Sequence, residues 1–379
     1  MESVILIISL LLFVSYAVLI IYYRQSWIAI QTYTPPGKFS PQTKISVIIP
    51  ARNEEKDLVD CLDSIIDQSY PKHLFNVLVV DDHSTDNTAD IILTYKGQNV
   101  QLISLKDFVA GNEINSYKKK AIEIAIQQST GDLIITTDAD CVVPQNWLRT
   151  IAAFYEEKMP EFIVMPVSID CGNKFIELFQ ALDFMTLQGI TGASVNKKFH
   201  SMCNGANLAY TKKAFNVVGG FKGIDSMASG DDMLLLHKIF KRYPNDIAYL
   251  KSKEVIVKTE PVKTISQFLN QRIRWASKAD KYEDKRIFTV LLLVYLFNAW
   301  ILMLAIGAVF FEFVYFFIAL LAAKTILELY FLYPVARFFN KQIILWWFPL
   351  AQPFHILYTL IAGWLGKFGT YTWKERKVK

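Results

Sequence analysis

The stretch GDLIITTDADC, residues 131–141, sets an apolar run, Leu133 to Ile135, directly before two acidic residues one position apart, Asp138 and Asp140. In an extended segment, positions i and i+2 project to the same side, so both carboxylates would face one site. Two like charges held this close repel unless a cation lies beside them. Oxygen ligands suit Mg²⁺ or Mn²⁺, and Mg²⁺ takes one or two protein carboxylates while phosphate oxygens and water complete its shell. The pair therefore predicts a metal-bound diphosphate ligand.

The strand before this pair is one of several. Strand-like runs alternate with helical patterns: ISVIIP from Ile45, a helix at about 54–68, VLVVDD from Val77, a helix from about Thr85, VQLISL from Val100, a helix from Lys118, and DLIITTDAD. This alternation predicts an α/β fold with a mainly parallel sheet covered by helices. Ligands of such a sheet bind outside the carboxyl ends of its strands. Asp81 and Asp82 end one strand as Asp138 and Asp140 end another, so the four define a candidate site.

Other uses of such a sheet are not supported. A dinucleotide-binding turn would need Gly-x-Gly-x-x-Gly after the first strand, where this chain has PARNEE, residues 50–55. Nucleic-acid binding is not predicted, because the basic tail accounts for most of the net charge of +5 and the sequence has no basic stripe with stacking aromatics. The four cysteines are widely spaced without a Cys-x-x-Cys pair, which indicates neither a zinc site nor a disulfide framework.

The two ends of the chain are more apolar than its middle. Val4 to Tyr23 form about 20 uncharged, mostly apolar positions, the length of a helix that crosses a bilayer. A cleaved signal peptide is the alternative, but it needs a basic start and the chain has Glu2 there. Further apolar stretches run over Ile287–Phe311, Phe313–Tyr333 and Ile343–Leu365. We therefore expect an integral membrane protein with a charged, water-compatible middle.

Six motifs in order carry a family resemblance: ISVIIPARNEE, VVDDHSTDNT, GDLIITTDADC, CNGANLAYTKKAFNVVGGF, SGDD and QRIRW. On these motifs, which cover about Lys44 to Trp275, the sequence resembles the membrane-bound family 2 glycosyltransferases. That group includes synthases of cellulose, hyaluronan and poly-N-acetylglucosamine, and lipid glycosyltransferases similar to ceramide glucosyltransferase. The resemblance implies a GT-A fold, an inverting transfer and a nucleotide-sugar donor.

The resemblance also implies roles for the acidic strand ends. It places Asp82, with Asp81 beside it, against the nucleobase, and assigns Asp138 and Asp140 to the Asp-x-Asp pair, with Asp140 holding Mg²⁺ or Mn²⁺. The family's lysine after the third strand falls on Lys118, Lys119 or Lys120, and the spacing to Ala121 favours Lys118 as a diphosphate contact. A solvated helix face is an equal alternative for that triplet.

The SGDD motif carries the predicted catalytic base. The resemblance assigns this role to Asp232, with Asp231 as its neighbour. A sugar hydroxyl is a poor nucleophile at neutral pH, and a carboxylate within hydrogen-bond reach can accept its proton. The alternative is a helix cap, because SGDDMLLLHKIF reads as a helix that opens at Ser229 to Asp231 with acidic residues in its first turn. The two roles are compatible.

The QRIRW motif lies in a stretch that predicts an amphipathic helix at the membrane surface. A plain interfacial helix explains its aromatic and basic residues equally well. The resemblance implies that Gln271 and Arg274 face the diphosphate and that Trp275 faces the acceptor, and an arginine fork suits phosphate oxygens. It also places CNGAN, with Asn204 and Gly205, on the acceptor side.

The predicted boundaries are a membrane anchor at 1–24, a linker at 25–43, a cytoplasmic GT-A domain at 44–261, the interfacial helix at 262–286, a C-terminal membrane region at 287–366 and a basic cytoplasmic tail at 367–379. The predicted function is metal-assisted transfer of a sugar from a nucleotide sugar to a membrane-associated lipid or glycan acceptor at the inner or plasma membrane. We favour single transfer to a lipid, because the membrane region is small for a polymer channel. A processive polysaccharide synthase and a non-catalytic scaffold are the alternatives.

The number of predicted membrane spans conflicts with the predicted cytoplasmic location of the basic tail. Cytoplasmic nucleotide sugars require the GT-A domain inside, so one span before it and three after it would leave the tail outside, against the positive-inside rule. One apolar stretch therefore does not cross. We favour a re-entrant or interfacial course for the last one, which contains Pro349 and Pro353. The alternative is the stretch with Lys324 and Glu328, although residues four apart can pair on one helix.

Overall fold

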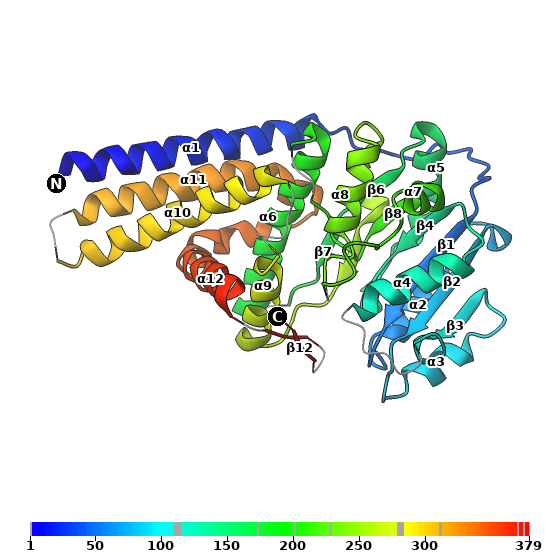
Figure 1. Ribbon diagram of the computed structural model, residues 1–379. Coiled ribbons are helices and arrows are strands. Elements are labelled where there is room, and N and C mark those ends of the chain that lie inside the picture. Colours follow the sequence, from blue (N-terminus) through cyan, green and yellow to red (C-terminus); the bar gives the residue numbers. More distant parts are fainter. Residues whose placement is uncertain are drawn as a thin grey trace. The chain divides into compact units, whose positions relative to one another are not determined.

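The computed structural model describes residues 2–109, 116–172, 174–199, 202–227, 229–278, 284–310, 313–369, 371–373 and 376–378. The chain forms two compact units, whose elements are labelled in Figure 1. We call Gln31–Ser168 with Ser201–Glu260 the sheet unit. Met1–Ile30, Ile169–His200 and Pro261–Lys379 form the helical unit.

The sheet unit is built on a seven-stranded sheet with the order β3-β2-β1-β4-β8-β6-β9. Its strands are β1 (Ile45–Ala51), β2 (Phe75–Asp81), β3 (Val100–Ser104), β4 (Leu133–Thr136), β6 (Phe162–Val164), β8 (Leu208–Thr211) and β9 (Ile247–Tyr249). Strands β1 to β4 are parallel to one another, β8 is antiparallel to β4 and β6, and β9 is parallel to β6. The predicted α/β fold with a mainly parallel sheet is confirmed.

The apolar runs of the sequence become the centre of this sheet. Val47, Ile48 and Ile49 of β1 are fully buried, as is all of β4. Strands covered on both faces read as continuous apolar runs rather than as alternating patterns. In the register of the sheet, Ala51 lies opposite Asp81 and Ile48 lies opposite Thr136, so the carboxyl ends of β2 and β4 meet at the same edge.

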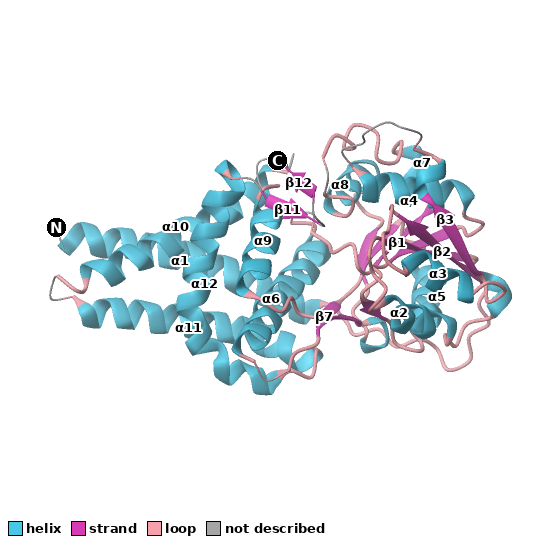
Figure 2. Ribbon diagram, turned by 90° about the horizontal axis from the view of Figure 1, so that it is seen from below, coloured by secondary structure: helices cyan, strands magenta, loops and turns pink. Residues whose placement is uncertain are grey.

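Helices and a smaller sheet complete the sheet unit. The helices are α2 (Leu58–Ile66), α3 (Thr88–Thr94), α4 (Tyr117–Gln128), α5 (Trp147–Lys158), α7 (Lys212–Val217) and α8 (Met233–Arg242), with short 3-10 turns at η1 (Lys72–Leu74), η2 (Leu105–Asp107) and η3 (Lys253–Val255). The smaller sheet has the order β5-β10-β7, with β5 at Cys141–Val142, β10 at Val257–Thr259 and β7 at Val167–Ile169. Figure 2 shows the helices around the magenta strands. Helix α4, which carries Lys118, packs on β1 and β2.

Helix α2 begins four residues later than the pattern predicts. The backbone N–H of Glu54 donates to Thr88 Oγ1 at 2.9 Å, and that of Glu55 donates to Asp86 Oδ2 at 3.2 Å. In the first turn of a helix these N–H groups would have no partner within the helix, and here Asp86 in the loop before α3 and Thr88 at the start of α3 accept their hydrogen bonds. The two loops that follow β1 and β2 are thereby tied together.

The helical unit contains α1 (Glu2–Ala29), α6 (Phe175–Lys197), α9 (Ile265–Ala276), α10 (Lys285–Gly307), α11 (Val314–Phe338), η4 (Gln342–Trp347) and α12 (Phe348–Phe368), followed by the hairpin β11 (Tyr371–Trp373) and β12 (Arg376–Val378). Four helical segments are long and apolar enough to cross a membrane: Ser3–Ala29, Lys285–Gly307, Val314–Phe338 and Gln342–Phe368. Helix α1 continues into the predicted linker. Lys374, Glu375 and Lys379 of the predicted tail, and residues 279–283 of the predicted interfacial helix, lie outside the described residues.

Helices α1, α10 and α11 pack side by side along their lengths, and α12 crosses them at an angle (Figure 1). Near its start, Gln352 bonds Glu328, which lies ten residues before the end of α11. Near its end, Gly363 packs on Tyr295, which lies ten residues after the start of α10. At 1.5 Å per residue both contacts are about 15 Å from the same end of the bundle. Helix α12 therefore stays at one depth instead of following the bundle from end to end.

Candidate active site

The Asp-x-Asp pair lies in a turn just beyond β4. The strand ends at Thr136, and the N–H of Cys141 donates to the carbonyl of Asp138 at 3.2 Å. The expectation that the two aspartates share an extended segment is therefore wrong, because the backbone turns between them. Their carboxylates have different partners: Asp140 accepts from Cys141 Sγ at 3.5 Å and from Thr259 Oγ1 at 3.4 Å. Burial and the charge of Asp140 raise the pKa of the Cys141 thiol, which keeps its proton available for this bond.

Lys118 joins two of the predicted site residues. Its Nζ lies 2.8 Å from Asp138 Oδ1 and 3.1 Å from Asp231 Oδ2. Burial lowers the pKa of Lys118, but the charges of Asp138 and Asp231 outweigh it, and the pKa is raised above its usual range. The lysine is therefore a fixed positive charge between the Asp-x-Asp turn and the SGDD motif. Of the three lysines that the sequence offered, the structure brings Lys118 to these carboxylates.

Lys119, the next residue, has a different position. It is 1% exposed, and its Nζ donates to the carbonyls of Ile224, Met227 and Ser229 at 2.6, 2.8 and 2.8 Å. A lysine ammonium has three N–H donors, so this set of acceptors satisfies all of them. The lysine thereby ties the loop that leads into the SGDD motif to the first turn of α4. This tethering role of Lys119 was not predicted from the sequence.

Asp232 is held from two sides. Its Oδ1 accepts the N–H of Met233 at 2.7 Å as the N-cap of α8, and its Oδ2 accepts the N–H of Gly205 at 3.2 Å. The predicted helix start at Ser229 to Asp231 is wrong: α8 begins at Met233, because Gly230 has a φ of +85° that lies outside the helical region. Capping and catalysis are compatible here, since each cap bond uses one lone pair of a carboxylate oxygen.

Gly205 approaches this site closely. A side chain there would place its Cβ 3.3 Å from Asp231 Oδ2 and 3.5 Å from Lys118 Nζ. The CNGAN segment that carries it is anchored by Asn207, whose side chain donates to the carbonyls of Pro166 and Val255 at 2.8 and 2.7 Å. Asn204 closes the turn by accepting the N–H of Ala206 at 3.0 Å. At Gly205 the segment thus presents its backbone to the two aspartates of SGDD.

Asp81 and Asp82 are buried at the end of β2. Asp81 Oδ1 accepts the N–H of Ser84 at 3.2 Å, which shapes the following turn. Asp82 Oδ1 lies 3.0 Å from His83 Nδ1 and 3.9 Å from Arg52 Nη1, which also donates to the Asp82 carbonyl at 3.1 Å. Sequence reasoning missed Arg52 and His83. Their only signal is a position just after a strand: Arg52 directly follows β1, in PARNEE, and His83 lies two residues after the end of β2, in VVDDHS.

The described residues include no group of three His, Cys, Asp or Glu side chains that could hold a metal ion. Asp138 and Asp140 nevertheless supply two carboxylates, and the side chain of Asp138 is 36% exposed. This donor set fits Mg²⁺ or Mn²⁺, because these ions take few protein oxygens when phosphate oxygens and water fill the remaining positions. It does not fit a tetrahedral zinc site, which needs three or four protein ligands.

The remaining predicted residues, Gln271, Arg274 and Trp275, lie on α9 of the helical unit. The helix opens with a capping box in which Thr264 accepts from the N–H of Gln267 at 3.2 Å and the Gln267 side chain accepts in return. Arg272 contacts two of the three: its Nη1 donates to Gln271 Oε1 at 2.6 Å, and its Cζ lies 4.2 Å from the centre of the Trp275 ring. Sequence reasoning did not single out Arg272 as a site residue.

Two family models match the chain. Residues 46–219 match the model described as Glycosyl transferase family 2, and residues 133–365 match the one described as Glycosyl transferase family group 2. The first range contains the sheet-unit residues Asp81 to Gly205 described above. The second extends through α9 and most of the long C-terminal helices.

Curated relatives match parts of the chain. It is 34% identical over 123 residues to the poly(ribitol-phosphate) beta-N-acetylglucosaminyltransferase TarS of Staphylococcus aureus, a match that covers 32% of this chain and 20% of the relative. It is 25% identical over 249 residues to the probable glycosyltransferase YdaM of Bacillus subtilis, covering 62% and 54%. It is 24% identical over 244 residues to the beta-monoglucosyldiacylglycerol synthase of Synechocystis sp., covering 62% and 48%. The chain spans less than two thirds of the length of each of these relatives.

One solved structure covers nearly the whole chain. The mannosyltransferase PcManGT of Pyrobaculum calidifontis, determined in complex with GDP-Man and Mn²⁺, superposes with a TM-score of 0.60 at 19% identity. The match covers 94% of this chain and 99% of that one. At this identity the likeness shows the shared fold, which is the GT-A fold that the motifs predicted.

Proposed function

The chain belongs to the family 2 glycosyltransferases, and from that premise we propose that it transfers one sugar, with inversion, from a nucleotide sugar to a membrane-associated lipid. The observation that carries the proposal is the group of Asp138, Lys118, Asp231 and Asp232 at one edge of the sheet unit. It combines a carboxylate for proton transfer with a fixed cation and further carboxylates. A non-catalytic scaffold would have no use for this arrangement.

Asp232 is the proposed general base. Its carboxylate accepts the proton of the acceptor hydroxyl as the oxygen attacks the anomeric carbon of the donor sugar. The bonds from Met233 N–H and Gly205 N–H hold the carboxylate in one orientation, which supports this role because a base must be aligned before attack begins. The C–O bond forms as the bond to the nucleoside diphosphate breaks on the opposite face, and a single displacement of this kind inverts the anomeric centre.

The leaving diphosphate requires positive charge. The pKa of Lys118 is raised above its usual range, so the side chain stays protonated and provides a fixed cation near the Asp-x-Asp turn. We assign Asp138 and Asp140 to holding Mg²⁺ or Mn²⁺, which would offset the charge that develops on the departing diphosphate. Preorganised charge of this kind stabilises the transition state more than water does.

Roles for the remaining residues follow from family membership and are part of this proposal. Asp82 contacts the nucleobase with Asp81 beside it, Gln271 and Arg274 contact the diphosphate, and Trp275 contacts the acceptor. Asn204 and Gly205 line the acceptor side. The contact of Gly205 with Asp232 supports that placement, since the acceptor hydroxyl must meet the base there.

The acceptor class and the membrane location are also proposals. The four long apolar helices support an integral membrane enzyme. One relative is a beta-monoglucosyldiacylglycerol synthase, which supports a lipid acceptor, while the relatives that act on poly(ribitol-phosphate) support a polymeric glycan as the alternative. We place the sheet unit in the cytoplasm at the inner or plasma membrane, because nucleotide sugars are cytoplasmic.

Nucleotide release tests the proposal directly. The purified chain in lipid is offered a panel of nucleotide sugars with Mn²⁺ or Mg²⁺, with and without a lipid extract, and nucleoside diphosphate is measured. We expect metal-dependent release with one donor, stimulated by the lipid and lost in D232N. Equal release by wild type and D232N for every donor would contradict the proposal. Product length separates the alternatives, because a ladder of products indicates a processive synthase and a single added sugar indicates one transfer.

A further inference from the structure

Arg272 is the most deeply buried residue of the QRIRW motif with a charged side chain. It is 4% exposed, whereas Arg274 is only partly buried. A charge taken out of water is costly unless it is paired and hydrogen-bonded. The position of Arg272 therefore depends on what it meets inside the helical unit.

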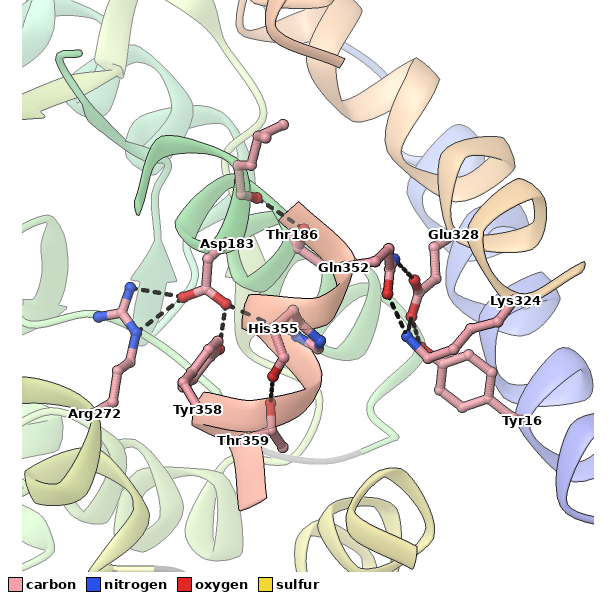
Figure 3. Close-up of polar contacts among 11 residues, drawn as sticks. Tyr16, Asp183, Thr186, Arg272, Lys324, Glu328, Gln352, His355, Tyr358 and Thr359 are labelled. Carbon is pink, nitrogen blue, oxygen red and sulfur yellow. Dashed lines mark hydrogen bonds and ion pairs between the residues drawn. The ribbon is translucent and has the colours of Figure 1, made fainter. Parts of the chain in front are cut away.

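Arg272 meets Asp183 of α6 (Figure 3). Its Nε and Nη2 lie 2.9 and 2.7 Å from Asp183 Oδ2, and both side chains are 3% exposed. Tyr358 of α12 donates its hydroxyl to Asp183 Oδ1, and His355 Nε2 lies 4.0 Å from the same oxygen. One carboxylate thus fastens α6, α9 and α12 together.

The same arginine contacts the functional residues of the motif. Its third nitrogen, Nη1, donates to Gln271 Oε1 at 2.6 Å. The guanidinium carbon Cζ lies over two aromatic rings, 4.2 Å from the centre of Trp275 and 4.5 Å from that of Phe268. The side chains of Gln271 and Trp275 are therefore oriented by contacts with Arg272.

Helix geometry links the direction of Arg272 to the directions of Gln271, Arg274 and Trp275. At 3.6 residues per turn, Gln271, Arg274 and Trp275 lie on one stripe of α9, and Arg272 points about a quarter turn away. A bond that fixes the direction of Arg272 also fixes the direction of that stripe. Rotation of α9 would break the hydrogen bond and the ion pair that join Arg272 to Asp183, so the stripe is held in one orientation.

We propose that Asp183 and Arg272 are a positioning pair that sets the orientation of Gln271, Arg274 and Trp275 for transfer. The inference rests on the proposed function, in which these three residues meet the diphosphate and the acceptor. Neither Asp183 nor Arg272 contacts the substrate in this proposal. They act through α9, which makes catalysis sensitive to a pair outside the Gln-x-x-Arg-Trp set.

The planar fork of arginine is what the position requires. Its Nε donates a hydrogen bond to Asp183 Oδ2, its Nη2 completes the ion pair with the same oxygen, its Nη1 donates to Gln271, and its Cζ lies over the Trp275 ring. Lysine keeps the charge but offers a single ammonium on a shorter, flexible chain, so R272K weakens the ion pair and no longer fixes the direction of Gln271, Arg274 and Trp275. Glutamate at 183 extends the carboxylate by one methylene toward the shorter lysine, so D183E should partly restore R272K.

A second buried ion pair in the same unit provides the matched control. Lys324 Nζ lies 2.6 Å from Glu328 Oε1, and these side chains are 1% and 9% exposed (Figure 3). Gln352 and Tyr16 bond the same carboxylate, and the contacts drawn in Figure 3 do not join this cluster to α9. The double variant K324M/E328Q removes both charges of a comparable pair and leaves the motif untouched.

The experiment compares wild type, R272K, D183E, R272K/D183E, R274A and K324M/E328Q as purified chains in lipid. The unfolding temperature, kcat and the KM for donor and acceptor are measured on the folded fraction. We expect R272K to lower kcat by about 10- to 100-fold and to raise the donor KM, because a displacement near 1 Å is enough for such a loss. We expect R272K/D183E to recover at least part of this loss, and K324M/E328Q to keep its kcat at a similar unfolding temperature.

The outcomes are distinguishable. An active wild type with R274A inactive and R272K unchanged would overturn this inference and leave the proposed function standing. Equal losses of kcat in R272K and K324M/E328Q at matched unfolding temperatures would also overturn it. The loss would then follow from the removal of any buried ion pair in this unit and not from the orientation of α9. A wild type without donor-dependent transfer would overturn both. If R272K does not fold, D183E alone carries the test, with the same expected direction and the same control.

Discussion

Asp232 has two roles that a single substitution can separate. Its carboxylate caps α8 through Met233 N–H, and we assign it the proton of the acceptor. Asparagine is as good an N-cap as aspartate but cannot accept a proton at neutral pH. We therefore expect D232N to keep its unfolding temperature within about 2 °C, roughly what a loss of a few tenths of a kcal/mol produces, and to lose about 10²- to 10⁴-fold in kcat.

The matched control for D232N is D231N. Asp231 pairs with Lys118 at 3.1 Å, and Asp138 remains as the other partner of that lysine. We expect a smaller loss of kcat in D231N and a lower pKa of Lys118. If kcat is lower in D231N than in D232N, the general base is Asp231 instead.

Lys251 carries a prediction for the pH dependence of stability. Burial lowers its pKa to about 8, from the usual value near 10.5, in a side chain that is only slightly exposed. Between these two values the unfolded chain holds a proton that the folded chain has released, so this residue makes the free energy of unfolding rise with pH from about 8 to 10.5. Below about pH 8 both states are protonated and the full cost of burying the charge remains.

The measurement is denaturant unfolding at several pH values between 7 and 10 for wild type and K251M. Other groups titrate in this range, but they are common to both proteins. We expect the stability of wild type relative to K251M to increase over this interval. A constant difference would show that Lys251 has an ordinary pKa in the folded chain.

At the scale of elements, the loop before α8 depends on Lys119. Three loop carbonyls accept its hydrogen bonds, and methionine would leave them without this donor while filling similar space. Buried acceptors that lose a partner cost about 1–3 kcal/mol. We expect K119M to fall in stability by that amount and to lose kcat more than donor affinity, because the loop carries the SGDD motif rather than the Asp-x-Asp turn.

Lys120 supplies the control on the same helix. Its Nζ pairs with Glu123 at 2.8 Å on a partly exposed face, and such pairs are worth little. We expect K120M to match wild type in kcat and unfolding temperature. Comparable defects in K119M and K120M would show that the helix, and not the tether, is at fault.

These elements also show what the sequence could predict. The alternation of apolar runs and helical patterns predicted the sheet, and the acidic strand ends predicted the edge where Asp81 and Asp138 lie, because parallel strands bring their carboxyl ends together. The predictions for the segment after β4 and for the start of α8 were wrong by a few residues. Both depend on local backbone angles, at the Asp-x-Asp turn and at Gly230, which the residue pattern does not specify. The pair of Asp183 and Arg272 is separated by 89 residues, and no local pattern distinguishes Asp183 from any other acidic residue on a helix.

At the scale of the whole molecule, the question is which side of the membrane the C-terminal hairpin faces. If α1, α10 and α11 cross, the chain starts on one side and reaches Phe338 on the side where α1 ends, which is the side of the sheet unit by chain connection. Trp27 near the end of α1 packs on Phe338, with ring centres 5.5 Å apart, which shows that the two helix ends lie together. The side of the hairpin then depends on α12 alone.

Helix α12 is apolar enough to cross, yet its contacts argue that it does not. Gln352 near its start and Gly363 near its end touch α11 and α10 at about the same depth, and Gly366 packs on Ala276 at the end of α9. A crossing helix would instead follow α10 from one end to the other.

We therefore expect a cysteine introduced at Lys377, in a background with Cys61, Cys141, Cys171 and Cys203 replaced, to react with an impermeant maleimide only after the cells are opened. A cysteine at Ser3 serves as the control and should react in intact cells. Labelling of the cysteine at 377 in intact cells would require α12 to cross, and would place the basic tail on the opposite side from the proposed active site.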